Sequence, residues 1–102
     1  MERIIEHKFK DHKINNHTQI LIIGTFNPDV FKNEATFFYG RSRNFLWNLL
    51  PKAFNEKSLK GKDIKFKLSF MNDHKIDFVD LISEIRVERG QREWLFWRIY
   101  WW

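Results

Sequence analysis

The stretch ILII, residues 20–23, restricts the possible folds of this chain more than any other. It is a continuous apolar run, rich in β-branched residues, and Gly24 ends it. A strand that is buried on both faces has this pattern, and such strands are typical of parallel sheets. A second short strand is predicted in the stretch KIDFVDLI, residues 75–82. The sequence therefore predicts a parallel sheet that contains both strands.

Two helices are predicted between these strands. Apolar residues recur at helical spacing over residues 43–54, where Pro51 predicts an end or a kink near Leu50. A second amphipathic helix is predicted over residues 62–74, with lysines around a single apolar stripe. That stripe consists of Ile64, Leu68 and Met71.

The order of these elements predicts the architecture. Residues 1–18 are expected to be an extended lead-in, and residues 27–40 are expected to be a loop. The chain has 102 residues, which is enough for one small domain. Strand, loop, two helices and strand in this order predict an α/β domain with three layers, α/β/α, and a parallel central sheet.

Composition and charge narrow the classes of function. A net charge of +5 favours an anionic partner such as nucleic acid. The absence of cysteine excludes disulfides and thiol catalysis, and it favours a reducing cytoplasm. No run reaches the roughly 18 apolar residues of a membrane helix, so no membrane partner is expected. His7, His12 and His17 have a spacing that fits neither a helix face nor alternate strand positions, so no metal site and no cofactor are predicted.

The final residues, 91–102, differ in composition from the rest of the chain. The stretch REWLFWRIYWW contains four of the five tryptophans. Three origins stay open: an amphipathic helix that covers the core, an interfacial membrane anchor, or a sequence that is out of frame or foreign. The abrupt change in composition favours the last of these.

Polar residues follow both predicted strands. The stretch GTFNP, residues 24–28, lies at the carboxyl end of the first strand, where open α/β sheets bind their ligands. Gly24 permits close approach of the backbone, and the amide of Asn27 can hold a water and a substrate carbonyl together. Asp77 and Asp80 are interpreted as turn or capping residues, although a carboxylate at a strand end can also face a ligand.

The stretch FFYGRSRNFLW, residues 37–47, combines aromatic rings with cations. A core helix does not need Arg41, Arg43 and Asn44 beside so many rings, and a disordered basic tail does not need the rings. A nucleic-acid-binding surface uses both, because rings stack on bases and cations bind phosphates.

Together, GTFNP and FFYGRSRNFLW resemble the uracil-DNA glycosylase superfamily, and more narrowly the mismatch-specific uracil/thymine and the hypoxanthine-DNA glycosylase branches. These enzymes pair a strand-end motif with an aromatic-rich loop that runs into a helix with an asparagine at its start. The resemblance covers about residues 6–86. It implies a monofunctional DNA glycosylase of base excision repair, which hydrolyses the N-glycosidic bond of uracil or another deaminated base flipped out of DNA, without metal or cofactor.

The resemblance also implies roles for single residues. Asn27 matches the water-positioning asparagine of the mismatch-specific branch, and Asn44 matches the asparagine on which the hypoxanthine branch relies, so either can be the catalytic amide. The residues implied to bind the base are Gly24, Thr25, Phe26, Pro28 and Tyr39. Those implied to lie near the DNA backbone are Arg41 and Arg43.

The chain also departs from the family pattern. Thr25 stands where the mismatch-specific motif has glycine. The late loop of the family, which wedges into DNA, has no counterpart after residue 86. Residues 1–90 therefore resemble an N-terminal portion of the family domain. Two alternatives to the enzyme stay open: a non-catalytic basic nucleic-acid-binding module, and an inactive truncated fragment.

Overall fold

The parallel strand pair predicted from the sequence lies at the centre of the fold. The structure is a computed structural model, and it describes residues 3–87. Strands β2 (Ile20–Gly24) and β3 (Ile76–Asp80) are parallel, in a register that pairs Gly24 with Asp80. Both predicted strands and their parallel pairing are therefore confirmed.

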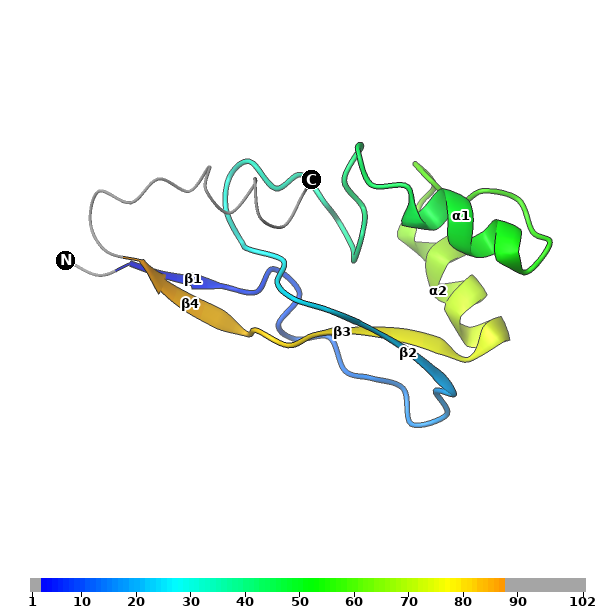
Figure 1. Ribbon diagram of the computed structural model, residues 1–102, viewed down its shortest axis with the longest axis horizontal. Helices are drawn as coiled ribbons and strands as arrows, with labels where there is room; N and C mark the ends of the chain where they lie inside the picture. Colours follow the sequence, from blue (N-terminus) through cyan, green and yellow to red (C-terminus); the bar gives the residue numbers. More distant parts are fainter. Residues whose placement is uncertain (1–2, 88–102) are drawn as a thin grey trace.

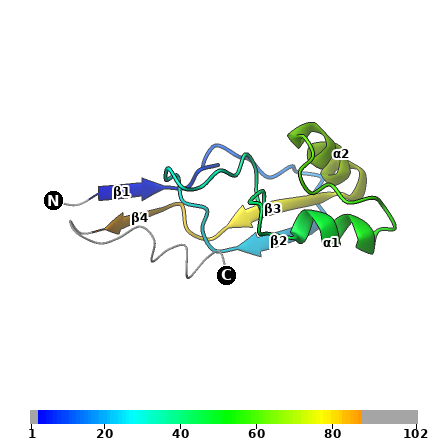
Figure 2. The same ribbon diagram turned by 90° about the horizontal axis from the view of Figure 1, so that it is seen from above.

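The two predicted helices are also present. They are α1 (Leu46–Ala53) and α2 (Ile64–His74). Both lie on one side of the β2–β3 pair (Figures 1 and 2). Asp63 caps the start of α2, because its side chain accepts a hydrogen bond from the backbone N–H of Lys65.

A second small sheet follows the first. Strand β1 (Arg3–Glu6) pairs antiparallel with β4 (Glu84–Val87). Because β4 comes shortly after β3, the two sheets lie end to end (Figure 1). The sequence predicted neither strand, since the first lay within an extended lead-in. The described residues therefore form a small α/β domain with two two-stranded sheets and two helices.

Helix α1 continues through Pro51 to Ala53, so of the two predicted outcomes, an end or a kink near Leu50, the end is wrong. Pro51 has no N–H to donate to the carbonyl of Trp47, four residues earlier. The backbone N–H of Leu59 donates to that carbonyl instead, at 2.8 Å. The loop after α1 thus satisfies the acceptor that the proline leaves open.

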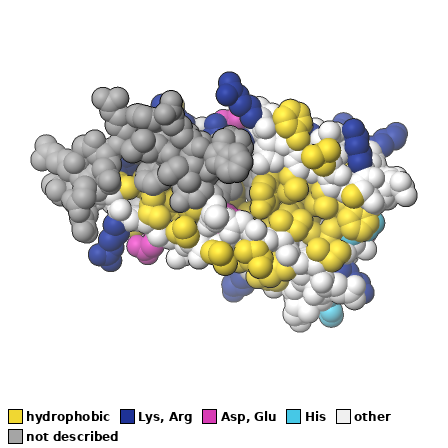
Figure 3. All heavy atoms as spheres, in the orientation of Figure 1, with side chains coloured by type: hydrophobic (Ala, Val, Ile, Leu, Met, Phe, Trp, Pro, Cys, Tyr) yellow, Lys and Arg dark blue, Asp and Glu magenta, His cyan; other side chains and the backbone are white. Residues whose placement is uncertain are grey.

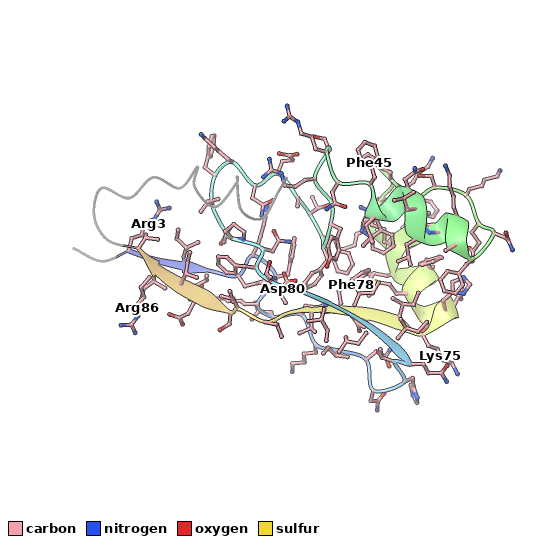
Figure 4. The ribbon with its side chains drawn as sticks, in the orientation of Figure 1. Arg3, Phe45, Lys75, Phe78, Asp80 and Arg86 are labelled. Atoms are coloured by element: carbon pink, nitrogen blue, oxygen red, sulfur yellow. The ribbon has the colours of Figure 1, made fainter. Side chains whose placement is uncertain are left out.

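Phe78 of β3 is the centre of the main hydrophobic core. It is 0% exposed. Its ring centroid lies 5.4 to 6.2 Å from those of Phe37, Phe38, Tyr39 and Trp47. Figure 4 shows Phe78 between β3 and the helices. Phe37 and Phe38 are therefore core residues, whereas Tyr39 is only half-buried.

The apolar run of β2 is less buried than predicted. Ile20, Leu21 and Ile23 are 45%, 41% and 58% exposed. Figure 3 shows hydrophobic side chains gathered over the half of the molecule that contains β2 and the helices. Within residues 3–87, only β3 pairs with β2. The expectation of a strand buried on both faces is therefore wrong for this part of the chain.

Helix α2 buries Met71 of the predicted stripe, but not Ile64 or Leu68. Ile64 and Leu68 are exposed, whereas Lys67, Phe70 and Met71 are buried. An aromatic ring buries more apolar area than an aliphatic side chain, so the helix face that carries Phe70 packs on the core. One consequence is that Lys67 is drawn into the protein.

The aromatic tail, residues 91–102, lies outside the described residues. Its three interpretations therefore stay predictions. Over residues 3–87, no helix is long and apolar enough to span a lipid bilayer.

Trp47→Phe is expected to lower the free energy of unfolding by about 2–4 kcal/mol. The indole Nε1 donates to the carbonyl of Phe38 at 2.7 Å, and the substitution removes this buried hydrogen bond and part of the packing on Phe78. Urea unfolding followed by circular dichroism measures the change. The matched control is Leu49→Ala in the same helix, because Leu49 is 62% exposed. Equal losses in both variants would contradict this account of the core.

Candidate functional site

The carboxyl ends of β2 and β3 open into a small pocket. Its cavity volume is about 100 Å³. The residues that line it are Gly24, Thr25, Phe26, Asn27, Phe38, Tyr39, Asn44 and Asp80. All except Phe38 and Asp80 are residues that the family resemblance implied for catalysis or base binding. They meet here because parallel strands end at the same edge of a sheet.

Three of the implied site residues lie outside this pocket. Pro28 is fully buried and forms an isolated β-bridge with His7. Arg41 lines a neighbouring pocket, where its guanidinium is 4.0 Å from the carboxylate of Glu34. Arg43 is exposed. Contact of either arginine with a DNA backbone stays a prediction.

Gly24 permits a close approach of two side chains. A β-carbon added at this position would lie 2.3 Å from Oδ1 of Asp80 and 2.9 Å from the hydroxyl of Tyr39. Real side chains do not tolerate such contacts, so only glycine lets both groups lie over the end of β2. The carboxylate and the hydroxyl therefore converge on one wall of the pocket.

Asp80 also forms a buried pair with His7. Its Oδ2 is 2.7 Å from Nε2 of His7, and the two side chains are 8% and 6% exposed. Nδ1 of His7 accepts a hydrogen bond from the backbone N–H of Phe9 at 2.9 Å. Because Nδ1 is an acceptor, the ring proton lies on Nε2, and neutral His7 donates to the carboxylate.

Backbone pairing brings His7 to the site. The N–H of Lys8 donates to the carbonyl of Asn27 at 2.7 Å, and the N–H of Asp29 donates to the carbonyl of Glu6 at 2.9 Å. The segment after β1 thus pairs with the loop after β2. This pairing fixes the position of the histidine relative to the end of β3.

Tyr39 adopts a backbone conformation that is rare for a bulky residue. Its φ of 56° lies in the left-handed region, which costs about 1–2 kcal/mol for a residue with a β-carbon. Such strain is found at functional sites more often than elsewhere. Burial, assisted by the negative charge of Asp80, raises the pKa of Tyr39 above its ordinary value. Tyr39 is therefore a neutral hydroxyl donor at pH 7.

Asn33 fixes the orientation of the Asn27 amide. Oδ1 of Asn33 accepts from the backbone N–H of Ala35 at 3.1 Å, which identifies its other group as the donor. That Nδ2 donates to the carbonyl of Pro28 at 2.9 Å and to Oδ1 of Asn27 at 2.5 Å. The oxygen of Asn27 is thus directed at Asn33, which leaves its Nδ2 available to donate to a ligand.

The amide of Asn44 is oriented in a similar way. Its Oδ1 accepts from the backbone N–H of Leu46 at 2.9 Å, at the start of α1. The oxygens of both asparagines therefore accept hydrogen bonds from the protein, and both amides can offer N–H donors to a ligand. The predicted role of Asn27 in positioning a water stays a prediction. The carboxylate of Asp80 adds a charged acceptor to the pocket lining.

Sequence reasoning did not predict the His7–Asp80 pair or the contact of Asn33 with Asn27. It interpreted Asp80 as a turn or capping residue, although a carboxylate at a predicted strand end was a usable signal. It considered His7 only as a metal ligand, and it did not single out Asn33. Within the part of the chain that the structure describes, no group of three or more His, Cys, Asp or Glu side chains could hold a metal ion.

Comparison with known proteins gives no match: no family model, curated protein or solved structure matches this chain. The resemblance to uracil-DNA glycosylases therefore rests on the sequence motifs alone and stays a prediction. Any function must be inferred from the geometry of the pocket.

Asp80→Asn is expected to lower the pKa of Tyr39, but not to its ordinary value, because burial remains as the larger cause. In the unsubstituted protein, Tyr39 should ionise at a higher pH than tyrosine in the unfolded chain. An NMR titration of the tyrosine ζ-carbon, with Tyr100→Phe removing the other tyrosine, measures both values. Asp73→Asn on the surface of α2 is the charge-matched control. An unchanged pKa in Asp80→Asn would contradict the placement of this carboxylate.

Proposed function

We propose that this protein is a DNA glycosylase that hydrolyses the N-glycosidic bond of uracil or another deaminated base, as in base excision repair. The observation that supports this is the convergence of two amide donors, a tyrosine hydroxyl and a carboxylate in one pocket at the ends of parallel strands. Enzymes that act on a base take it out of the stack and hold it in such a pocket. DNA as partner and a cytoplasmic setting belong to the same proposal.

In this proposal the amides bind the departing base. Negative charge develops on the base as its bond to the sugar breaks. N–H donors that are already oriented toward that charge stabilise the transition state without reorganisation. Asn27 is held by Asn33, and Asn44 is held by the start of α1, so both donors are oriented in advance.

Asp80 acts on the water and the sugar. When the glycosidic bond breaks, its electron pair leaves with the base and the sugar becomes oxocarbenium-like. The negative carboxylate stabilises this cation and orients the attacking water, whose proton it accepts as the new C–O bond forms. His7 holds Oδ2 of the carboxylate, which keeps the side chain in one orientation. Asp80 would thus take the role that the family resemblance implied for an amide.

The three-layer α/β/α arrangement of the family is part of the same proposal. Ile20, Leu21 and Ile23 are exposed on β2, and these apolar side chains support a further layer or strand that covers them. Residues 1–90 would then correspond to the N-terminal portion of the family domain.

The proposal is tested with oligonucleotides that contain one deoxyuridine or one deoxyinosine, in single strands and in mismatched duplexes. Released base leaves an abasic site, which alkali cleaves. Asp80→Asn and Asn27→Asp are each expected to slow release about 10²-fold or more, with DNA binding retained. Asn27→Asp keeps the acceptor that Asn33 needs but replaces the donor.

Asp73→Asn is the control, because it changes the charge of an exposed residue that does not line the pocket. If the unsubstituted protein binds DNA but releases no base, the enzyme proposal fails and a non-catalytic binding module takes its place. If it releases base and Asp80→Asn does so equally fast, the role given to Asp80 is wrong.

A further inference from the structure

A second pocket opens beside the first, with a cavity volume of about 310 Å³. Tyr39 lines both pockets, so the two adjoin. The charged side chains that line the second pocket are Glu34, Arg41, Lys60 and Lys67. Cations therefore outnumber carboxylates around it.

Lys67 is the most unusual of these cations. It lies on the buried face of α2 and is only 4% exposed. Its ammonium is 5.5 Å from the centre of the Trp47 ring, over the ring face. Within residues 3–87, no carboxylate forms an ion pair with it. Lys67 thus lacks a neutralising carboxylate among the residues that the structure describes, and a buried ammonium without an anionic partner is unfavourable.

Lys60 adds a second positive charge to this pocket. Its Nζ donates to the backbone carbonyls of Ser42 and Asn44, each at 2.7 Å, and to that of Arg41 at 3.4 Å. These bonds hold its charge in the pocket wall. Burial lowers the pKa of Lys67, and the positive charge of Lys60 lowers it further. Two ammonium groups thus repel each other across a pocket that an anion would stabilise.

Glu34 does not neutralise the pocket. Its Oε1 accepts from the backbone N–H of Ser42 at 3.3 Å, and its Oε2 is 4.0 Å from Arg41. The Glu34 side chain is 55% exposed. Its charge is therefore largely screened by water, and the cation that it approaches is Arg41 and not Lys67.

We propose that this pocket binds a phosphodiester group of a DNA strand, with Lys67 as the residue that donates to its oxygens. The position of the pocket fits this ligand, because Tyr39 separates it from the pocket that would hold the flipped base. Lys60 contributes charge, since the protein already uses its three donors. The inference rests on the proposed function in one respect, which is that the phosphate belongs to the strand that carries the target base.

The test measures binding of a fluorescent single-stranded oligonucleotide that contains one 2′-fluorodeoxyuridine, whose electronegative substituent prevents hydrolysis. Lys67→Gln is expected to weaken binding about tenfold at low salt. It should also reduce the slope of log K against log salt by about 0.7, the value for one phosphate contact of a single strand. Lys65→Gln removes the same charge from an exposed position of α2 and should change binding less than about twofold. Equal effects of the two variants would overturn the proposal.

A folding defect is excluded with Lys67→Met, which keeps the apolar stem and removes the ammonium. Its melting temperature should equal or exceed that of the unsubstituted protein, because a buried charge is replaced by an apolar group. Its loss of oligonucleotide binding should match that of Lys67→Gln. A stable Lys67→Met variant with normal binding would overturn the proposal.

The phosphate itself is identified with an uncharged methylphosphonate in place of one phosphodiester beside the modified nucleotide. If Lys67 binds that group, the replacement weakens binding to the unsubstituted protein but not to Lys67→Gln. If the losses of binding from the methylphosphonate and from Lys67→Gln simply add, wherever the methylphosphonate is placed, the proposal is overturned. A second experiment measures acylation of Lys67 in the presence of inorganic phosphate or of the oligonucleotide. If phosphate protects Lys67 and the oligonucleotide does not, the ligand is a free anion and not DNA.

The outcomes also separate this inference from the proposed function. Suppose that no base is released, but the methylphosphonate weakens binding to the unsubstituted protein and not to Lys67→Gln. The enzyme proposal then fails and the phosphate site stands. If base is released and Lys67→Gln behaves as Lys65→Gln does, the phosphate site fails and the enzyme proposal stands.

Discussion

The pairing of Gly24 with Asp80 is the constraint on which the candidate site depends. The register of β2 and β3 sets a carboxylate beside the only kind of residue that has no β-carbon. A slip of one residue would turn the side chains of β3 to the opposite face and would place Val79 at this position. The pocket is therefore built by strand pairing, and the loops that line it add to a position that the sheet has already fixed.

Neighbouring residues of the loop that contains Phe37, Phe38 and Tyr39 have two functions: some pack in the core, and one lines the candidate site. Phe37 and Phe38 pack against Phe78 and attach the loop to the sheet, so most of its rings serve the core. Tyr39 follows in the left-handed conformation, which directs its hydroxyl to the end of β2. The strain at Tyr39 is sustained because the rings before it are buried. A loop of the same composition without these anchors could not hold the tyrosine between two pockets.

The sequence predicted what depends on local pattern and missed what depends on distant contacts. The strand around residues 20–24 was found because its apolar run is continuous, and the strand around residues 76–80 was found in the stretch KIDFVDLI. His7 and Asp80 are 73 positions apart, and no periodicity connects them. Lys67 is one of the lysines predicted around the apolar stripe of this helix, and the pattern did not predict its burial. Its burial follows from the packing of Phe70, which the pattern of α2 did not reveal.

The orientation of the two amides bears on which bases the proposed enzyme would accept. Deamination replaces an amino group, which donates hydrogen bonds, by a carbonyl, which accepts them. Asn27 and Asn44 can both present N–H donors because a side-chain donor and a backbone donor direct their oxygens toward the protein. Such donors can bind the carbonyl of uracil or hypoxanthine, but they would face another donor on cytosine or adenine. A buried donor left without an acceptor discriminates strongly between such pairs. Selectivity for deaminated bases would thus come from Asn33 and the start of α1, which orient the amides without touching the base.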